Sequence, residues 1–199
     1  MIESHLRELL YETLETELGN VDVYKTALLC AIDTDLKAEW QKYLHETENH
    51  VQVVLRIFDK LKLDPDEETA GRHVVRHIGE SLVEAMELSL SAGNAEASQR
   101  VAAERIVEAE TKDQLNWELL SRLAEHINGT EGRIIQEAAA EIENEKNSHL
   151  YHGARCARQL WSEFLEMPAP LPTPDEVEKK FKTAVGSGRL KNKVQPLIN

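Results

Sequence analysis

The chain has 199 residues, of which 41% are hydrophobic, 30% charged and 5% aromatic, a composition that excludes collagen, a disulfide-rich scaffold and a wholly disordered chain. Its net charge of −13 argues against nucleic-acid binding, because an acidic protein repels the phosphate backbone. No apolar run approaches the roughly 18–20 residues of a membrane span, and the first residues do not resemble a signal peptide. With only Cys30 and Cys156 as thiols, we expect a cytoplasmic protein that binds no membrane.

Proline marks a boundary near the end of the chain. Five of the six prolines lie from Pro168 onward, and this segment also has six basic residues against three acidic ones. Closely spaced prolines end a helix and favour an extended chain. We therefore predict a domain over residues 1–167, followed over residues 168–199 by a proline-rich linker and a flexible, weakly basic tail.

The domain has the pattern of an all-α protein. Apolar residues recur at spacings of three and four in segments rich in Glu, Leu, Ala, Lys and Arg, and no segment alternates like a strand. Capping residues and glycines at 33–35, 64–66, 93–94 and 128–129 divide these segments. The predicted helices cover about residues 4–31, 36–62, 71–92, 95–127 and 131–166. Four long helices and one short helix, between the second and third long ones, indicate a bundle.

Each long helix carries a carboxylate on its apolar face, and two of them also carry a histidine there. A single inward glutamate can mean that the face is assigned one position wrong. Four carboxylates and two imidazoles in one core would instead require a cation among them. Such a set suits two first-row metal ions. The candidate ligands are Glu17, Glu46, His50, Glu110, Glu145 and His149.

The segment from Glu17 to Tyr24 resembles the Glu-x6-Tyr signature of ferritin-like di-iron proteins, and the order of the other candidates is similar to that superfamily's layout. The resemblance implies a ferritin-like four-helix bundle with two metal ions per chain, iron first and manganese as the alternative. It implies a possible oxidoreductase or ferroxidase that acts with O₂ or peroxide. Tyr24 is then a candidate redox residue or hydrogen-bond partner. In this assignment Glu17 and Glu145 each bind an ion, Glu46 and Glu110 bridge, and His50 and His149 supply nitrogen.

The chain departs from the family's Glu-x-x-His pattern on two helices. Thr47 and Lys146 stand three residues before His50 and His149, and the glutamates stand four residues before them. A spacing of four also keeps two side chains on one helix face. On the last helix, Glu145 and His149 are the pair we expect most strongly, and we expect no other inward charge there. Whether Glu46 or Glu48 serves on the second long helix stays open.

Other residues have weaker signals. His152 is a candidate extra ligand or partner of one. The cluster of His73, His77, Glu80 and Glu84 fits a solvated helix face. Trp117 is expected to be a packing residue.

The sequence also allows two alternative functions and predicts a state of assembly. A non-catalytic scaffold of the same fold would satisfy its inward carboxylates with Arg, Lys or water. Residues 183–190 are similar to the C-terminal targeting peptides of ferritin-like cargo of encapsulin shells, which would make a shell protein the partner. A second apolar stripe on the helix over 95–127 predicts a homodimer, although the short helix could also cover it. The members of this stripe are Val101, Leu115, Leu119 and Leu123.

Overall fold

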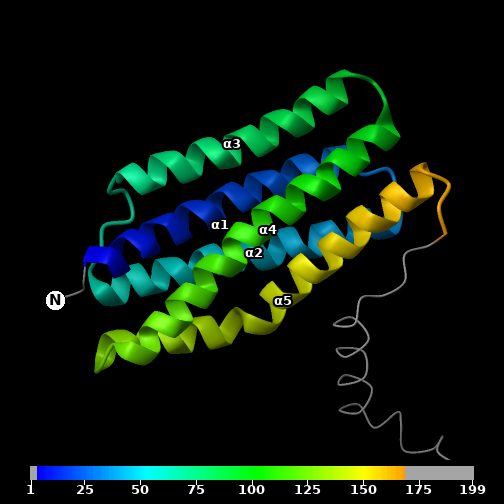
Figure 1. Cartoon of the computed structure of the whole chain (residues 1–199). Helices are drawn as coiled ribbons and strands as arrows, with labels where there is room; N and C mark the ends of the chain where they lie inside the picture. The colour runs from blue at the N-terminus through cyan, green and yellow to red at the C-terminus, as the bar shows by residue number, and fades with distance from the viewer. Residues whose placement is uncertain (1–3, 169–199) are drawn as a thin grey trace, which may run out of the picture. The chain divides into compact units, whose positions relative to one another are not determined.

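The computed structural model describes residues 4–168, and these residues form five helices and no strand. The all-α prediction is confirmed, and each helix end lies within two residues of its predicted position. The predicted tail lies, apart from Pro168, outside the described residues. The helices are α1 (Ser4–Cys30), α2 (Thr34–Leu61), α3 (Ala70–Ser91), α4 (Ala95–His126) and α5 (Thr130–Phe164) (Figure 1).

Side-chain caps and glycines end the helices where the sequence predicted breaks. The carboxylate of Asp33 accepts a hydrogen bond from the Leu36 N–H at the start of α2, and Asn94 does the same for Ala97 at the start of α4. These bonds satisfy amide groups that have no partner within the helix. Gly93 and Gly129 have φ values of 74° and 97°, which a residue with a side chain rarely adopts.

The apolar core consists of two separate clusters. In each cluster α1 packs against α2 and α4, and the first cluster also includes the first half of α5. The first cluster is built around Leu10, Phe58, Leu120 and Ile135. The second is built around Ala27, Trp40, Met86 and Ile106. Buried polar side chains lie along the helices between the two clusters and form the candidate site described below.

Helix α3 packs against α1 and α4 and is held by a buried ion cluster. The carboxylate of Glu15 on α1 accepts hydrogen bonds from Nε of Arg72 at 2.8 Å and from Nε of Arg76 at 2.7 Å. One turn further along α1, Gly19 meets Gly79, where a Cβ on Gly79 would lie 3.6 Å from the Gly19 Cα. The ion cluster and the close approach of the two glycines together fix α3 on α1.

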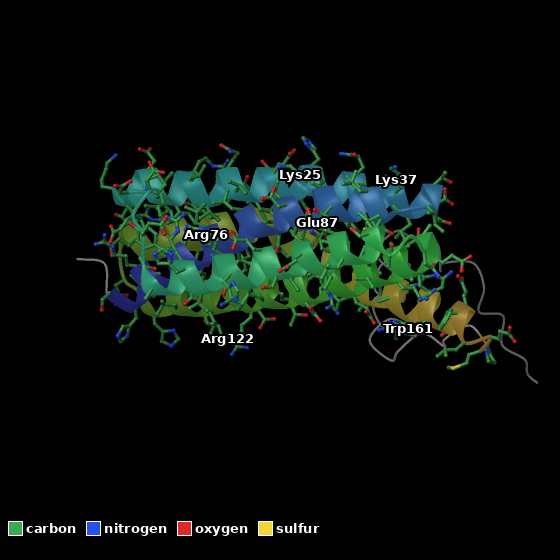
Figure 2. All side chains as sticks on the ribbon, turned by 90° about the horizontal axis from the view of Figure 1, so that it is seen from above. Lys25, Lys37, Arg76, Glu87, Arg122 and Trp161 are labelled. Carbon is green, nitrogen blue, oxygen red and sulfur yellow. The ribbon has the colours of Figure 1, made fainter. Side chains whose placement is uncertain are left out.

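Charged side chains lie on the surface of the helices. Lys25, Lys37 and Arg122 are exposed, and Figure 2 shows Arg122 at the lower edge of the bundle. Of the second apolar stripe on α4, Leu115 and Leu119 are exposed, and Val101 and Leu123 pack against the core clusters. The homodimer stays a prediction.

The chain divides into two units between Trp161 and Ser162. In the second unit, the described residues complete α5 and a turn in which the Met167 N–H donates to the Ser162 carbonyl at 2.9 Å. The predicted boundary after residue 167 stays a prediction. None of the helices described has the length and apolar character needed to cross a membrane.

We expect the Glu15→Ala substitution to lower the free energy of unfolding by about 3 kcal/mol, because it leaves the buried Arg72 guanidinium without its carboxylate. The matched control is Asp22→Ala on the same helix. Asp22 pairs with Lys25, and both side chains are exposed, so its loss should cost less than about 0.5 kcal/mol. Urea unfolding followed by circular dichroism measures both values, and equal losses would contradict the structural role of the ion cluster.

Candidate functional site

Eight polar side chains from four helices lie between the two apolar clusters, and we refer to them as the polar layer. Each is 4% exposed or less. Burying polar groups at this density is costly unless they are paired or bind a ligand. The polar layer consists of Glu17 and Asn20 on α1, Thr47 and His50 on α2, Glu110 and Asp113 on α4, and Lys146 and His149 on α5.

Two pairs of a carboxylate and an imidazole face each other inside the polar layer. The Nδ1 atom of His50 lies 3.7 Å from Oε2 of Glu17, and the Nδ1 atom of His149 lies 3.5 Å from Oε1 of Glu110. The centroids of the two imidazole rings are 5.6 Å apart. The site thus has two halves, one from α1 and α2 and one from α4 and α5. Each half places an imidazole nitrogen close to a carboxylate oxygen.

The other nitrogen of each histidine bonds a carboxylate on the opposite helix. Nε2 of His50 lies 2.8 Å from Oε2 of Glu145, and Nε2 of His149 lies 2.9 Å from Oε2 of Glu46. A carboxylate acceptor favours the tautomer with its proton on Nε2. Both histidines then present an Nδ1 lone pair to the interior. Glu46 and Glu145, predicted as ligands, therefore lie on the outer side of the imidazole rings.

Two ring residues hold the inward carboxylates in matching positions. The Tyr24 hydroxyl donates to Oε1 of Glu110 at 2.9 Å, and the Trp117 indole N–H donates to Oε1 of Glu17 at 2.7 Å. Tyr24 follows Glu17 by seven residues, and Trp117 follows Glu110 by seven. Each half of the site thus orients the carboxylate of the other half, and Trp117 has a polar role beyond packing.

Lys146 is the main difference from the sequence-based prediction, which placed no further charge on the inward face of α5. Its ammonium is 4% exposed and forms an ion pair with Asp113. It also lies 3.5 Å from Oε1 of Glu17 and 3.8 Å from Oε2 of Glu110. The prediction was wrong because a lysine next to Glu145 looks like an outward residue, and α5 turns its side chain toward three carboxylates on other helices.

This cation sets the ionisation of the inward carboxylates. Burial raises the pKa of the Glu17 carboxyl, but the Lys146 ammonium and the Trp117 N–H outweigh the burial and hold that pKa well below its ordinary value. The pKa of Glu110 is also lowered: burial opposes this, and the Lys146 ammonium and the Tyr24 hydroxyl outweigh the burial. Burial next to Glu110 raises the pKa of Tyr24, so its hydroxyl remains a donor.

Several atoms of the polar layer have no hydrogen-bond partner. They include Oε2 of Glu17, Oε2 of Glu110 and the Nδ1 atoms of His50 and His149. Among the described residues, however, no three His, Cys, Asp or Glu side chains already converge as a ready-made metal site. The Lys146 ammonium lies within 4 Å of both inward glutamates, and the predicted two-ion centre stays a prediction.

The remaining candidates lie outside the polar layer. Glu48 is exposed, 3.9 Å from His45. His152 is half-exposed, and its Nδ1 atom lies 2.8 Å from the Tyr43 hydroxyl and from Glu39. The side chains of His73, His77, Glu80 and Glu84 are exposed on α3.

Comparisons of the chain with family models, with curated proteins and with solved structures find no match.

We expect the Lys146→Met substitution to lower the free energy of unfolding more at neutral pH than at acidic pH. The variant and the unaltered chain are first freed of metal with a chelator. The folded-state pKa of Glu17 lies below the 4.5 of an ordinary glutamate, so the stability it contributes is present above about pH 4.5 and is lost as the pH falls toward 2. Without the ammonium, the folded-state pKa values of Glu17 and Glu110 rise, and acid protonates these carboxyls in the folded chain. The stability gap to the unaltered chain should therefore narrow from pH 7 to pH 4.

The control for this measurement is Lys112→Met on α4, because Lys112 pairs with the half-buried Glu12 outside the polar layer. Its stability should run parallel to that of the unaltered chain over the same pH range, as followed by urea unfolding. A Lys146→Met gap that is constant with pH would show that the ammonium does not control these carboxylates.

Proposed function

We propose that the polar layer binds one divalent first-row transition-metal ion and that the chain is a metal-binding protein of ferritin-like architecture. The proposed ligands are Glu17, His50, Glu110 and His149. The observation that carries this proposal is a set of four atoms without a hydrogen-bond partner inside one buried layer: Oε2 of Glu17 and of Glu110, and Nδ1 of His50 and of His149.

Charge supports one divalent ion. The polar layer contains three carboxylates, those of Glu17, Glu110 and Asp113, and one ammonium, that of Lys146. With neutral histidines, two negative charges remain, and leaving them unbalanced in a buried layer is strongly unfavourable. A divalent ion neutralises them, and the ion pair with Asp113 gives Lys146 a place beside it.

Donor spacing and donor chemistry support the same ion. Two ligands of one ion, each about 2.1 Å from it, lie roughly 3–4 Å apart, which agrees with the 3.7 Å between Nδ1 of His50 and the free Oε2 of Glu17. On the other side, Nδ1 of His149 lies 3.5 Å from the Glu110 carboxylate, at the Oε1 atom that Tyr24 also bonds. Imidazole nitrogen with carboxylate oxygen suits iron, manganese or zinc. Glu46 and Glu145 then act as partners of the ligating histidines and raise their basicity.

The proposal keeps iron as the first metal and manganese as the second, and it changes the predicted ion number from two to one. A bound iron ion would supply redox chemistry with O₂ or peroxide. The residues of this chain would hold the ion, orient Glu17 and Glu110 through Trp117 and Tyr24, and exclude water. Tyr24 is the residue nearest to a catalytic role, because its hydroxyl bonds a proposed ligand.

A second candidate is a metal-free helical scaffold in which Lys146 is the resident cation. It is favoured by the Lys146–Asp113 ion pair and by the lack of a preformed three-donor group among the described residues. The scaffold would have to tolerate the two uncompensated charges or protonate its histidines. Metal analysis separates the two candidates.

We expect the protein, produced without a histidine tag, to bind one Fe(II) or Co(II) ion per chain in anaerobic titration with elemental analysis. His149→Leu and Glu110→Gln should each abolish this binding, because each removes one of only four ligands. The matched control is His77→Leu on the exposed face of α3, which should bind as the unaltered chain does. No metal in the unaltered chain would support the scaffold, and two ions would restore the dinuclear prediction.

We expect Glu46→Gln to weaken metal binding by about 10- to 100-fold without abolishing it, because it alters the partner of His149 and not a ligand. Glu48→Gln is the control, since that exposed carboxylate contacts no residue of the polar layer. Competition with a metal chelator measures both affinities. Complete loss of binding in Glu46→Gln would make Glu46 a ligand, as the sequence-based prediction had it.

A further inference from the structure

We infer that the cavity between α4 and α5 is the route by which a hydrated divalent cation reaches the polar layer. This inference rests on the proposed function. The cavity has a volume of about 370 Å³ and is open to solvent. A water molecule occupies about 30 Å³, so an ion with six waters needs roughly 200 Å³ and fits.

The inner end of the cavity touches the polar layer. Its lining includes Lys146 and Trp117, and these two side chains contact the inward carboxylates directly. The Lys146 ammonium lies 3.5 Å from Glu17, and the Trp117 indole donates to the same carboxylate at 2.7 Å. An ion at this end of the cavity is separated from the proposed ligands by two side chains.

On the α5 side the cavity is lined by two small residues, Ala139 and Ala140. Next to the polar layer on α4 and α5, the Gln114 side-chain amide donates a hydrogen bond to the Asn147 side-chain oxygen at 3.4 Å. Both amides line the cavity, and their oxygen atoms can replace waters of a hydrated cation.

Charge favours a cation over an anion in this cavity. Three glutamates line its exposed part, Glu118, Glu125 and Glu143, against Arg122 there and Lys146 at the inner end, so the lining carries a net charge of −1. The chain as a whole carries −13. A negative cleft concentrates cations and raises their association rate. An anion would be repelled first by these glutamates and then by the carboxylates of the polar layer, which lie beyond Lys146.

A second cavity fits the role less well. It lies among α1, α3 and α4, has a volume of about 110 Å³ and reaches Asn20 of the polar layer. This volume is less than a third of that of the first cavity, and its α3 wall includes the apolar residues Val75, Ile78 and Leu82. A hydrated ion would pass an apolar wall there, which offers its waters no hydrogen-bond partner.

The test is the rate of Co(II) uptake by the metal-free full chain, followed by stopped-flow visible absorption. Ala140→Phe fills the cavity from an exposed position and should slow uptake at least 10-fold. Its affinity for Co(II) should stay within 2-fold of the unaltered chain, because a blocked route slows uptake and release equally. The matched control is Ala38→Phe, an exposed alanine on α2 away from the cavity, with an unchanged rate expected.

A second pair of variants tests the charge of the cavity. The double variant Glu118→Gln/Glu143→Gln should slow uptake at low salt about 3- to 10-fold and reduce its dependence on ionic strength. The control removes two exposed glutamates from α3, Glu80→Gln/Glu84→Gln, and should change the rate less than 2-fold.

The results separate the route from the binding site. If Ala140→Phe takes up Co(II) as fast as the unaltered chain, or if Ile78→Trp at the second cavity is the variant that slows uptake, the route is overturned and the metal site stands. If the unaltered chain takes up no Co(II) or Fe(II), the proposed function and the route both fail.

Discussion

The Lys146 ammonium lies between three carboxylates in the interior of the chain, and the rest of the polar layer depends on this arrangement. One positive charge among three negative ones lowers the pKa of Glu17 and Glu110 and leaves two charges uncompensated. Both inward glutamates also have a ring N–H or O–H donor, and both histidines have an outer carboxylate. These contacts hold charged donors in place where burial alone would exclude them.

The site is nearly symmetric between its two halves. Glu17 corresponds to Glu110, Tyr24 to Trp117, and Glu46 with His50 to Glu145 with His149, each at the same spacing in the sequence. The contacts between the halves also come in matching pairs: each contact has a counterpart made by the corresponding residues of the other half. Two positions break it: Asn20 opposite Asp113, and Thr47 opposite Lys146. The extra ion pair between Lys146 and Asp113 therefore belongs to the α4–α5 half alone.

Periodicity and capping residues were enough to predict the helices, because these signals are local: Asp33, Asn94 and Gly129 end or begin helices through neighbouring atoms. The inward positions of Glu17, Glu110, His50 and His149 also followed from periodicity. The contacts of Glu46 and Glu145 with the outer nitrogens of the two histidines did not, because a spacing of four residues leaves open which side of an imidazole a carboxylate reaches. Lys146 and Asp113 meet only through the packing of α4 on α5, which no pattern within one helix reveals.

The separation of the apolar core into two clusters has a consequence for how the helices align. Apolar side chains alone tolerate sliding of one helix past another, since one turn of α5 exchanges one hydrophobic contact for a similar one. A shift of α5 by one turn, about 5.4 Å, would move Lys146 away from Asp113 and toward apolar neighbours. Breaking a buried ion pair in this way is strongly unfavourable. We therefore expect the polar layer to fix the register of the four helices. Many alignments would bury equal apolar area, and the polar layer selects a single one of them.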